Sequence, residues 1–106
     1  MNTEFEAAVQ DYVENLLKAY QKLTYTEVAE FAPAKIEDIV ISGKEVQLTI
    51  FKQESPPGLP DALLLTAQIV RAALGGIHSF HYEKGLVFGA QQPVREASDE
   101  ELKASA

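Results

Sequence analysis

The chain of 106 residues contains no cysteine and no tryptophan, and it is poor in basic residues. Without cysteine there can be no disulfide, no thiolate nucleophile and no zinc site built from thiolates. Nine Lys and Arg stand against sixteen Asp and Glu, which gives a formal net charge of −7. Because a phosphate backbone is bound by clustered Lys and Arg, this balance argues against a nucleic-acid partner.

The sequence also lacks a long hydrophobic run. The most apolar stretch, residues 62–74, is interrupted by Thr66, Gln68 and Arg71 and is shorter than the roughly 20 residues of a membrane-spanning helix. The first residues combine neither a basic segment nor an apolar core, so we expect no secretory signal peptide and no membrane association. Together with the absence of cysteine, this leads us to expect a cytoplasmic protein.

The remaining composition is that of a globular protein. Hydrophobic residues make up 46% of the chain and charged residues 24%. These fractions and the length are typical of one compact domain, so residues 1–106 are expected to form a single small α+β domain. A core of this size is thin, and association with another copy or another protein is one way to bury more apolar surface.

Residues 4–23 show the clearest pattern. Apolar residues recur at steps of three and four from Phe5 to Leu23, which predicts an amphipathic helix. Thr24 and Glu27 have the spacing of a capping box, so a short helix is expected over residues 24–32, ending before Pro33. An extended conformation near Tyr25 is the alternative.

A β-hairpin is predicted over residues 35–53. The segment from Ser42 to Glu45 supplies the turn, in which Gly43 can adopt a positive φ. In the second strand Val46, Leu48 and Ile50 alternate with polar residues, so one face should lie on the core. The opposite face carries Phe51, a possible contact point. Residues 54–61 contain three prolines and are expected to form a stiff loop.

Residues 61–74 are ambiguous between helix and strand. Strong helix formers, Asp61 as a cap and the Gly75–Gly76 pair after the segment favour a helix. The same run fits a strand, with Leu63, Leu65, Ala67 and Ile69 on one face and Thr66 and Gln68 on the other. The periodicity of an apolar run does not separate these alternatives.

The last third of the chain is expected to be extended and then helical. Residues 77–90 are rich in aromatic and branched side chains, and Lys84–Gly85 is expected to form a turn or bulge. Ser98 and Glu101 form a further capping box, which predicts a short terminal helix. The expected fold is α+β, with the N-terminal amphipathic helix packed on an antiparallel sheet of three to five strands. This order of elements resembles, in architecture alone, the NTF2-like and cystatin-like folds, which host both enzymes and binding modules.

One segment gathers residue types that can carry chemistry. In a strand, Ser79, His81 and Glu83 would share one face, with Glu83 orienting His81 for acid–base work, and Tyr82 would lie beside them in sequence. We therefore take His81, Glu83 and Tyr82 as candidate catalytic residues. His78 and His81 are candidate metal ligands, although no third ligand is implied. No cofactor motif is present, and no cofactor is expected.

These observations support two functional hypotheses. The first is a non-enzymatic protein that works through contacts, as a homo-oligomer or with another protein. The alternative is a binder of a small molecule, or an acid–base enzyme, with a pocket between residues 4–23 and the sheet; Tyr12, Tyr20 and Tyr25 could line such a cavity. The negative charge lies mainly on the helical segments, whereas residues 35–53 and 75–92 are each neutral. The sheet is therefore the first place to look for self-association.

Overall fold

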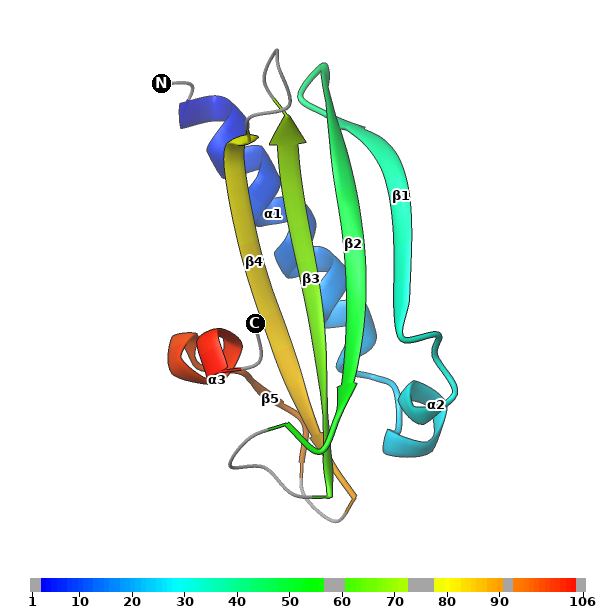
Figure 1. The fold of residues 1–106 in the computed structure, drawn as a ribbon. Helices are drawn as coiled ribbons and strands as arrows, with labels where there is room; N and C mark the ends of the chain where they lie inside the picture. Colours follow the sequence, from blue (N-terminus) through cyan, green and yellow to red (C-terminus); the bar gives the residue numbers. More distant parts are fainter. Residues whose placement is uncertain (1–2, 57–60, 73–77, 91–92, 105–106) are drawn as a thin grey trace.

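Five antiparallel strands form one twisted sheet, and a long helix packs along one of its faces (Figure 1). The computed structural model describes residues 3–56, 61–72, 78–90 and 93–104. Along the chain the elements are α1 (Thr3–Tyr20), α2 (Tyr25–Ala29), β1 (Ala34–Ile41), β2 (Lys44–Glu54), β3 (Ala62–Ala72), β4 (His78–Gly89), β5 (Arg95–Glu96) and α3 (Asp99–Ala104). The sheet order follows the chain order from β1 to β5. The expected α+β class, with the N-terminal helix on an antiparallel sheet, is confirmed.

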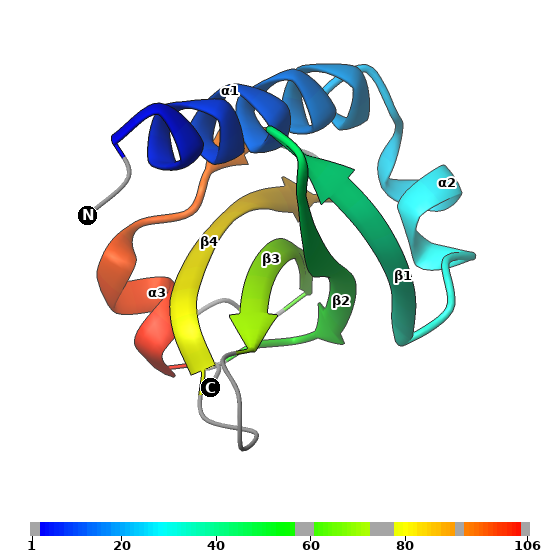
Figure 2. The same cartoon turned by 90° about the horizontal axis from the view of Figure 1, so that it is seen from above.

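The main core lies between α1 and the sheet (Figure 2). The apolar stripe of α1 is buried there, as the three- and four-residue spacing predicts. The stripe packs against alternate residues of the central strands. The buried set includes Phe5, Val9, Val13, Leu17, Leu48, Ile50, Leu65, Ile69, Leu86 and Phe88. The helix ends at Tyr20, three residues before the predicted end, and hydrogen-bonded turns carry the chain onward to Leu23.

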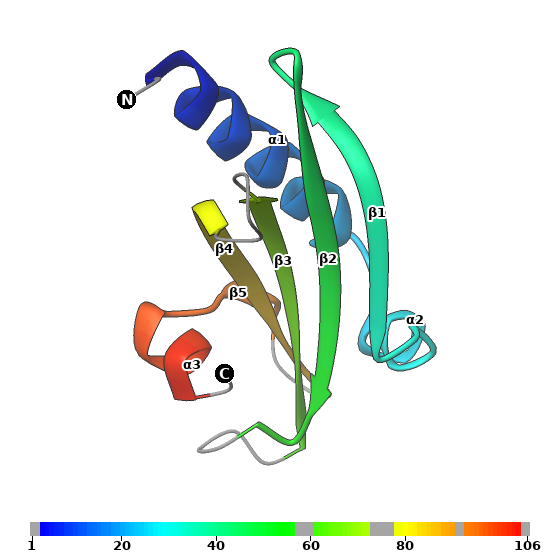
Figure 3. The same cartoon turned by 45° about the horizontal axis from the view of Figure 1, so that its top comes forward.

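The short second helix begins as its sequence predicts. The Thr24 hydroxyl accepts a hydrogen bond from the Glu27 amide at 3.1 Å, and the Thr24 amide donates to the Glu27 carboxylate at 2.9 Å. This reciprocal capping box satisfies two amides that the first turn leaves without partners. Val28 is fully buried, and α2 lies beside the start of β1 (Figure 3).

The predicted hairpin is formed by β1 and β2. Ile41 pairs with Lys44, so the turn has only two residues. Ser42 and Gly43 both have positive φ, 52° and 77°, the combination that a type I′ turn requires. Val46, Leu48 and Ile50 are buried against the helical side, which confirms the period of two.

The helix favoured for residues 61–74 is wrong, because Ala62–Ala72 form the central strand β3. Leu63, Leu65, Ala67 and Ile69 face α1, and Leu64 is buried on the other side of the sheet. A strand covered on both faces reads as a continuous apolar run, which conceals its period. Asp61 does not cap a helix but lies in a turn with φ of 61°. The Gly75–Gly76 pair and residues 57–60 of the proline-rich loop lie outside the described residues.

The turn or bulge expected at Lys84–Gly85 is also wrong. Strand β4 runs straight through both residues, and its pairing with β3 is regular from Ala62 to Arg71. Lys84 is tolerated on the helical side because it lies near the sheet edge, where its ammonium is 3.3 Å from the Glu96 carboxylate. Gly85 is required for close packing: a Cβ there would lie 3.0 Å from both the Leu102 side chain and the Leu65 carbonyl oxygen.

The C-terminal segment forms the predicted short helix α3. Ser98 caps it through a reciprocal pair of hydrogen bonds with Glu101, and Arg95 donates two hydrogen bonds to the Glu101 carboxylate at 2.7 and 2.6 Å. The pKa of Glu101 is lowered to about 2, mainly by the Arg95 guanidinium and to a smaller extent by the Ser98 amide. Leu102 packs in a second small core with Ala62, Leu64, Val87 and Ala97. No helix among the described residues is long and apolar enough to cross a membrane.

Candidate functional site

The two faces of the sheet differ in how they are covered. One face is buried under α1, whereas the described residues cover the other face only at one end, where Leu102 of α3 packs on Leu64 and Val87. We call the uncovered part of this second face the open face. Strand alternation and the pairing register place on it Ile36, Asp38, Val40, Gln47, Thr49, Phe51, Gln68, Val70, His81 and Glu83.

Large apolar side chains are exposed on the open face. Ile36 is 62% exposed, Val40 64% and Phe51 40%. Ile36 and Val40 lie on β1, four residues apart on one side of the strand, and Phe51 pairs opposite Ala34 on β2. Three exposed apolar side chains near one sheet edge are the kind of surface that marks an interaction site.

Strand β1 is the edge of the sheet on this side, and its backbone has groups available for pairing. The Lys52 amide donates to the Pro33 carbonyl at 2.9 Å, which fixes the hydrogen-bonding phase of the hairpin. In an antiparallel ladder, hydrogen-bonded pairs alternate with pairs that are not hydrogen-bonded to each other. Because Pro33 belongs to the first kind, Ile36, Asp38 and Val40 belong to the second and turn their amides and carbonyls away from β2. The exposed apolar side chains therefore belong to the same residues whose backbone groups point outward.

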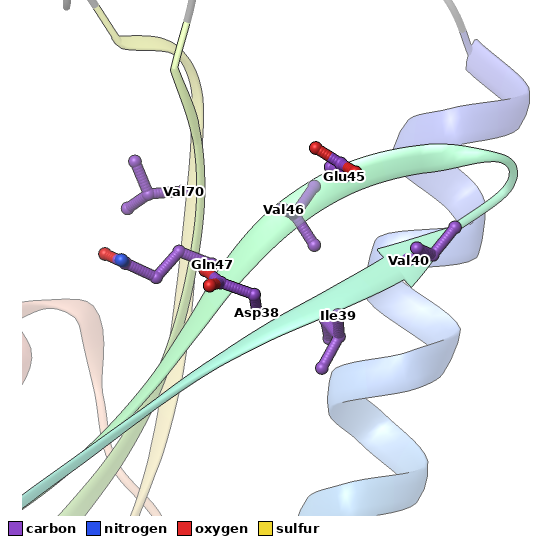
Figure 4. A pocket seen from close by; sticks show the side chains of 7 residues that line it. All are labelled: Asp38, Ile39, Val40, Glu45, Val46, Gln47 and Val70. Atoms are coloured by element: carbon purple, nitrogen blue, oxygen red, sulfur yellow. The ribbon is translucent and has the colours of Figure 1, made fainter.

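Two hollows lie along the open face. One, of about 540 Å³, includes Asp38, Val40, Gln47 and Val70 in its lining. Figure 4 shows Asp38 and Gln47 on the far side of the β1–β2 hairpin from α1. The other, of about 380 Å³, lies between Phe51 and α3, and its lining includes Phe51, Leu64, Thr66, Gln68, Glu83 and Leu102.

The structure brings two of the three candidate catalytic residues together on the open face. His81 Nε2 is 2.8 Å from the Gln68 side-chain nitrogen and 3.9 Å from a Glu83 carboxylate oxygen. An amide nitrogen can only donate, so in this contact the imidazole accepts through Nε2. Gln68 thereby occupies the lone pair that a general base would use. Glu83 is too far away for the predicted orienting hydrogen bond.

Tyr82 lies on the opposite face from His81 and Glu83. It pairs with Ile69 on the α1 side, where it is half-buried, and this burial raises the pKa of its hydroxyl. The three candidates therefore do not form one cluster. His81 is 48% exposed on the face away from α1, so it does not enter a pocket between α1 and the sheet.

The candidate metal site rests on His78 and His81. His78 begins β4, but its side chain, like that of Ser79, lies outside the described part of the structure. Within that described part, no three His, Asp or Glu side chains converge in a way that could hold a metal ion.

Sequence reasoning missed the most relevant residues of the open face. Ile36 and Val40 fell within the predicted hairpin of residues 35–53 without being singled out, and Gln68 was only a polar position in an ambiguous segment. The sequence does contain a pattern that could have drawn attention to Ile36 and Val40. They share one face of a predicted strand whose other face carries the charged residues Lys35 and Glu37. Only the sheet order shows that this strand is an edge and that nothing in the described chain covers it.

Comparison with models of known protein families, with curated proteins and with solved structures found no match for this chain.

Proposed function

We propose that this chain is a non-enzymatic interaction module that associates with a second copy of itself through β1 and the open face. The observation that carries this proposal is the coincidence, on Ile36 and Val40, of exposed apolar side chains and outward-pointing backbone groups. Each feature alone is common, because single apolar residues are often exposed and every open sheet has an edge. Their combination offers both hydrogen bonds and apolar burial to one partner.

The geometry that uses both features is antiparallel pairing of two β1 strands about a two-fold axis. It extends both sheets and brings Ile36 and Val40 of one copy beside those of the other. A two-fold axis uses the same surface on both copies, so one patch is sufficient. The occupied lone pair of His81 and the separation of Tyr82 from it also favour contact over catalysis.

Charge works against this association. Each copy carries a net charge of −7, and Asp38 lies between Ile36 and Val40 on the pairing edge. Like charges on facing strands are destabilising. Added salt should therefore strengthen self-association by screening this repulsion, whereas it would weaken binding to a basic partner.

Sedimentation velocity over a wide range of concentration tests the proposal. We expect a reversible dimer that tightens with salt and with Asp38→Asn, and a double variant Ile36→Lys/Val40→Lys that weakens it by about tenfold or more. Tyr12→Lys is the matched control, because Tyr12 is a comparably exposed apolar residue on α1. A wild-type chain that stays monomeric at every concentration, or a Tyr12→Lys variant as impaired as the double variant, would refute the proposal.

A further inference from the structure

A separate cavity lies on the α1 side of the molecule, where the end of α1, the segment after α2 and the first residues of β1 meet. Its volume is about 330 Å³, within the range of small-molecule pockets. It is lined by Tyr20, Phe31, Ala32, Ala34, Lys35 and Ile50. The Tyr20 and Lys35 side chains lie on the α1 side of the sheet, opposite the open face, although Ala34 and Lys35 of the lining belong to the edge strand β1.

The cavity is apolar over most of its lining. Ile50 is buried, and the rings of Tyr20 and Phe31 pack edge to face with centroids 5.9 Å apart. Edge-to-face packing holds both rings in fixed positions, so these walls are already formed before any ligand enters. Burial raises the pKa of the Tyr20 hydroxyl, which therefore stays protonated and able to donate a hydrogen bond at neutral pH.

Lys35 is the single charged residue among the described residues of the lining. Its side chain is 69% exposed, and its ammonium lies 2.8 Å from the Glu37 carboxylate. An ammonium carries three donors, so the contact with Glu37 leaves two for another acceptor. An acidic protein thus presents a cation beside an apolar cavity, and none of the described residues that line it is acidic.

From this arrangement we infer that the cavity binds a small amphiphile with an apolar body and one carboxylate. The apolar body lies against Phe31 and Ile50, and the carboxylate accepts hydrogen bonds from the Lys35 ammonium and the Tyr20 hydroxyl. The assignment favours an anion over a cation of the same shape because Lys35 repels a cation at this point. It also predicts competition between the ligand and Glu37 for the same ammonium.

Octanoate, octylamine and 1-octanol are suitable probes because they share an apolar chain and differ in charge. Each is titrated into the full-length chain and followed by two-dimensional amide NMR. We expect octanoate to shift the amides around Tyr20, Phe31 and Lys35, and to bind about threefold to fivefold more tightly than octanol, the factor that an exposed charge pair contributes. Octylamine is expected to bind least.

Three variants separate the contribution of the Lys35 charge to octanoate binding from the contribution of the apolar cavity. Lys35→Gln should weaken octanoate to the affinity of octanol without changing octanol itself, and Glu37→Gln should tighten octanoate by freeing the ammonium. Ala32→Leu, at an exposed lining position, should abolish binding of both by filling the space. Lys103→Gln on α3 is the control and should change nothing.

The inference is overturned if octanoate does not bind, if its shifts lie elsewhere, or if octanoate and octylamine bind equally. It is also overturned if Lys35→Gln leaves octanoate binding unchanged. Because Lys35, Glu37 and Ala32 are exposed, these variants are expected to fold, and circular dichroism checks that they do. None of these outcomes depends on the oligomeric state, so the cavity and the proposed dimer can fail separately.

Discussion

The two faces of the sheet show how one set of strands supports two different surfaces. Alternate residues of β2, β3 and β4 form an apolar layer under α1 that Lys84 interrupts near the sheet edge, and Ile69 is fully buried within this layer. The opposite face is mixed: it is apolar where α3 covers Leu64 and Val87, and elsewhere polar residues lie among Ile36, Val40, Phe51 and Val70. The comparison shows that the helical face holds the fold, while the open face is available for contact.

The largest expected effect comes from truncating an isoleucine to alanine on each face of the sheet and comparing the two losses of stability. Ile69→Ala removes a fully buried side chain beneath α1 and should lower the free energy of unfolding by about 2–5 kcal/mol. Ile36→Ala makes the same chemical change on the open face and should cost below about 1 kcal/mol. Urea denaturation of dilute protein measures both values. Equal losses would mean that the open face is also part of the core.

The second-largest effect on stability is expected at Gly85, which lies where the part of the sheet covered by α3 meets the open face. Gly85→Val places carbon atoms where Leu102 and the Leu65 carbonyl already lie, and should cost about 1–3 kcal/mol through overpacking. Amide exchange should show that α3 opens more often in this variant.

A second substitution serves as the control for that result. In a Leu102→Ala background the same Gly85→Val change should cost less, because one of the two close contacts has been removed. An undiminished cost would indicate that α3 does not depend on contact with Gly85.

The smallest effect is a pH dependence of α3. The folded pKa of Glu101, about 2, is below the ordinary glutamate value of 4.5, so the docked helix binds fewer protons than the undocked one. The contribution of Glu101 is therefore fully present above about pH 4.5 and is lost as the pH falls toward 2. NMR of the α3 amides should show undocking in this window.

Substitution of Glu101 distinguishes this carboxylate from the other acids. Glu101→Gln should remove the ion pair with Arg95 at every pH and flatten the response of α3. Glu100→Gln on the same helix is the control and should leave the response in place. If Glu100→Gln flattens the response equally, the contact between Arg95 and Glu101 is not its cause.

Local sequence was sufficient wherever an element carries its own signal. The stripe of α1, the Thr24 and Ser98 capping boxes and the Ser42–Gly43 turn all rest on residues within a few positions of one another. Local hydrogen bonds and periodicity decide such features, so the α+β class and the number of strands were within the predicted range. His81 and Glu83 could be placed on one face for the same reason.

Tertiary structure alone decided which surfaces are covered. The segment that forms β3 stayed ambiguous between helix and strand because its first half is buried on both faces, and one cover is α3, which begins 27 residues after the end of β3. Lys84–Gly85 was predicted to be a turn or bulge because the packing reason for this glycine, the approach of Leu102, comes from the same distant helix. The exposed edge at Ile36 and Val40 and the cavity beside Lys35 likewise depend on the order of strands and the position of α2. Sequence periodicity determines which residues share a face, but only long-range packing determines whether that face is buried or exposed.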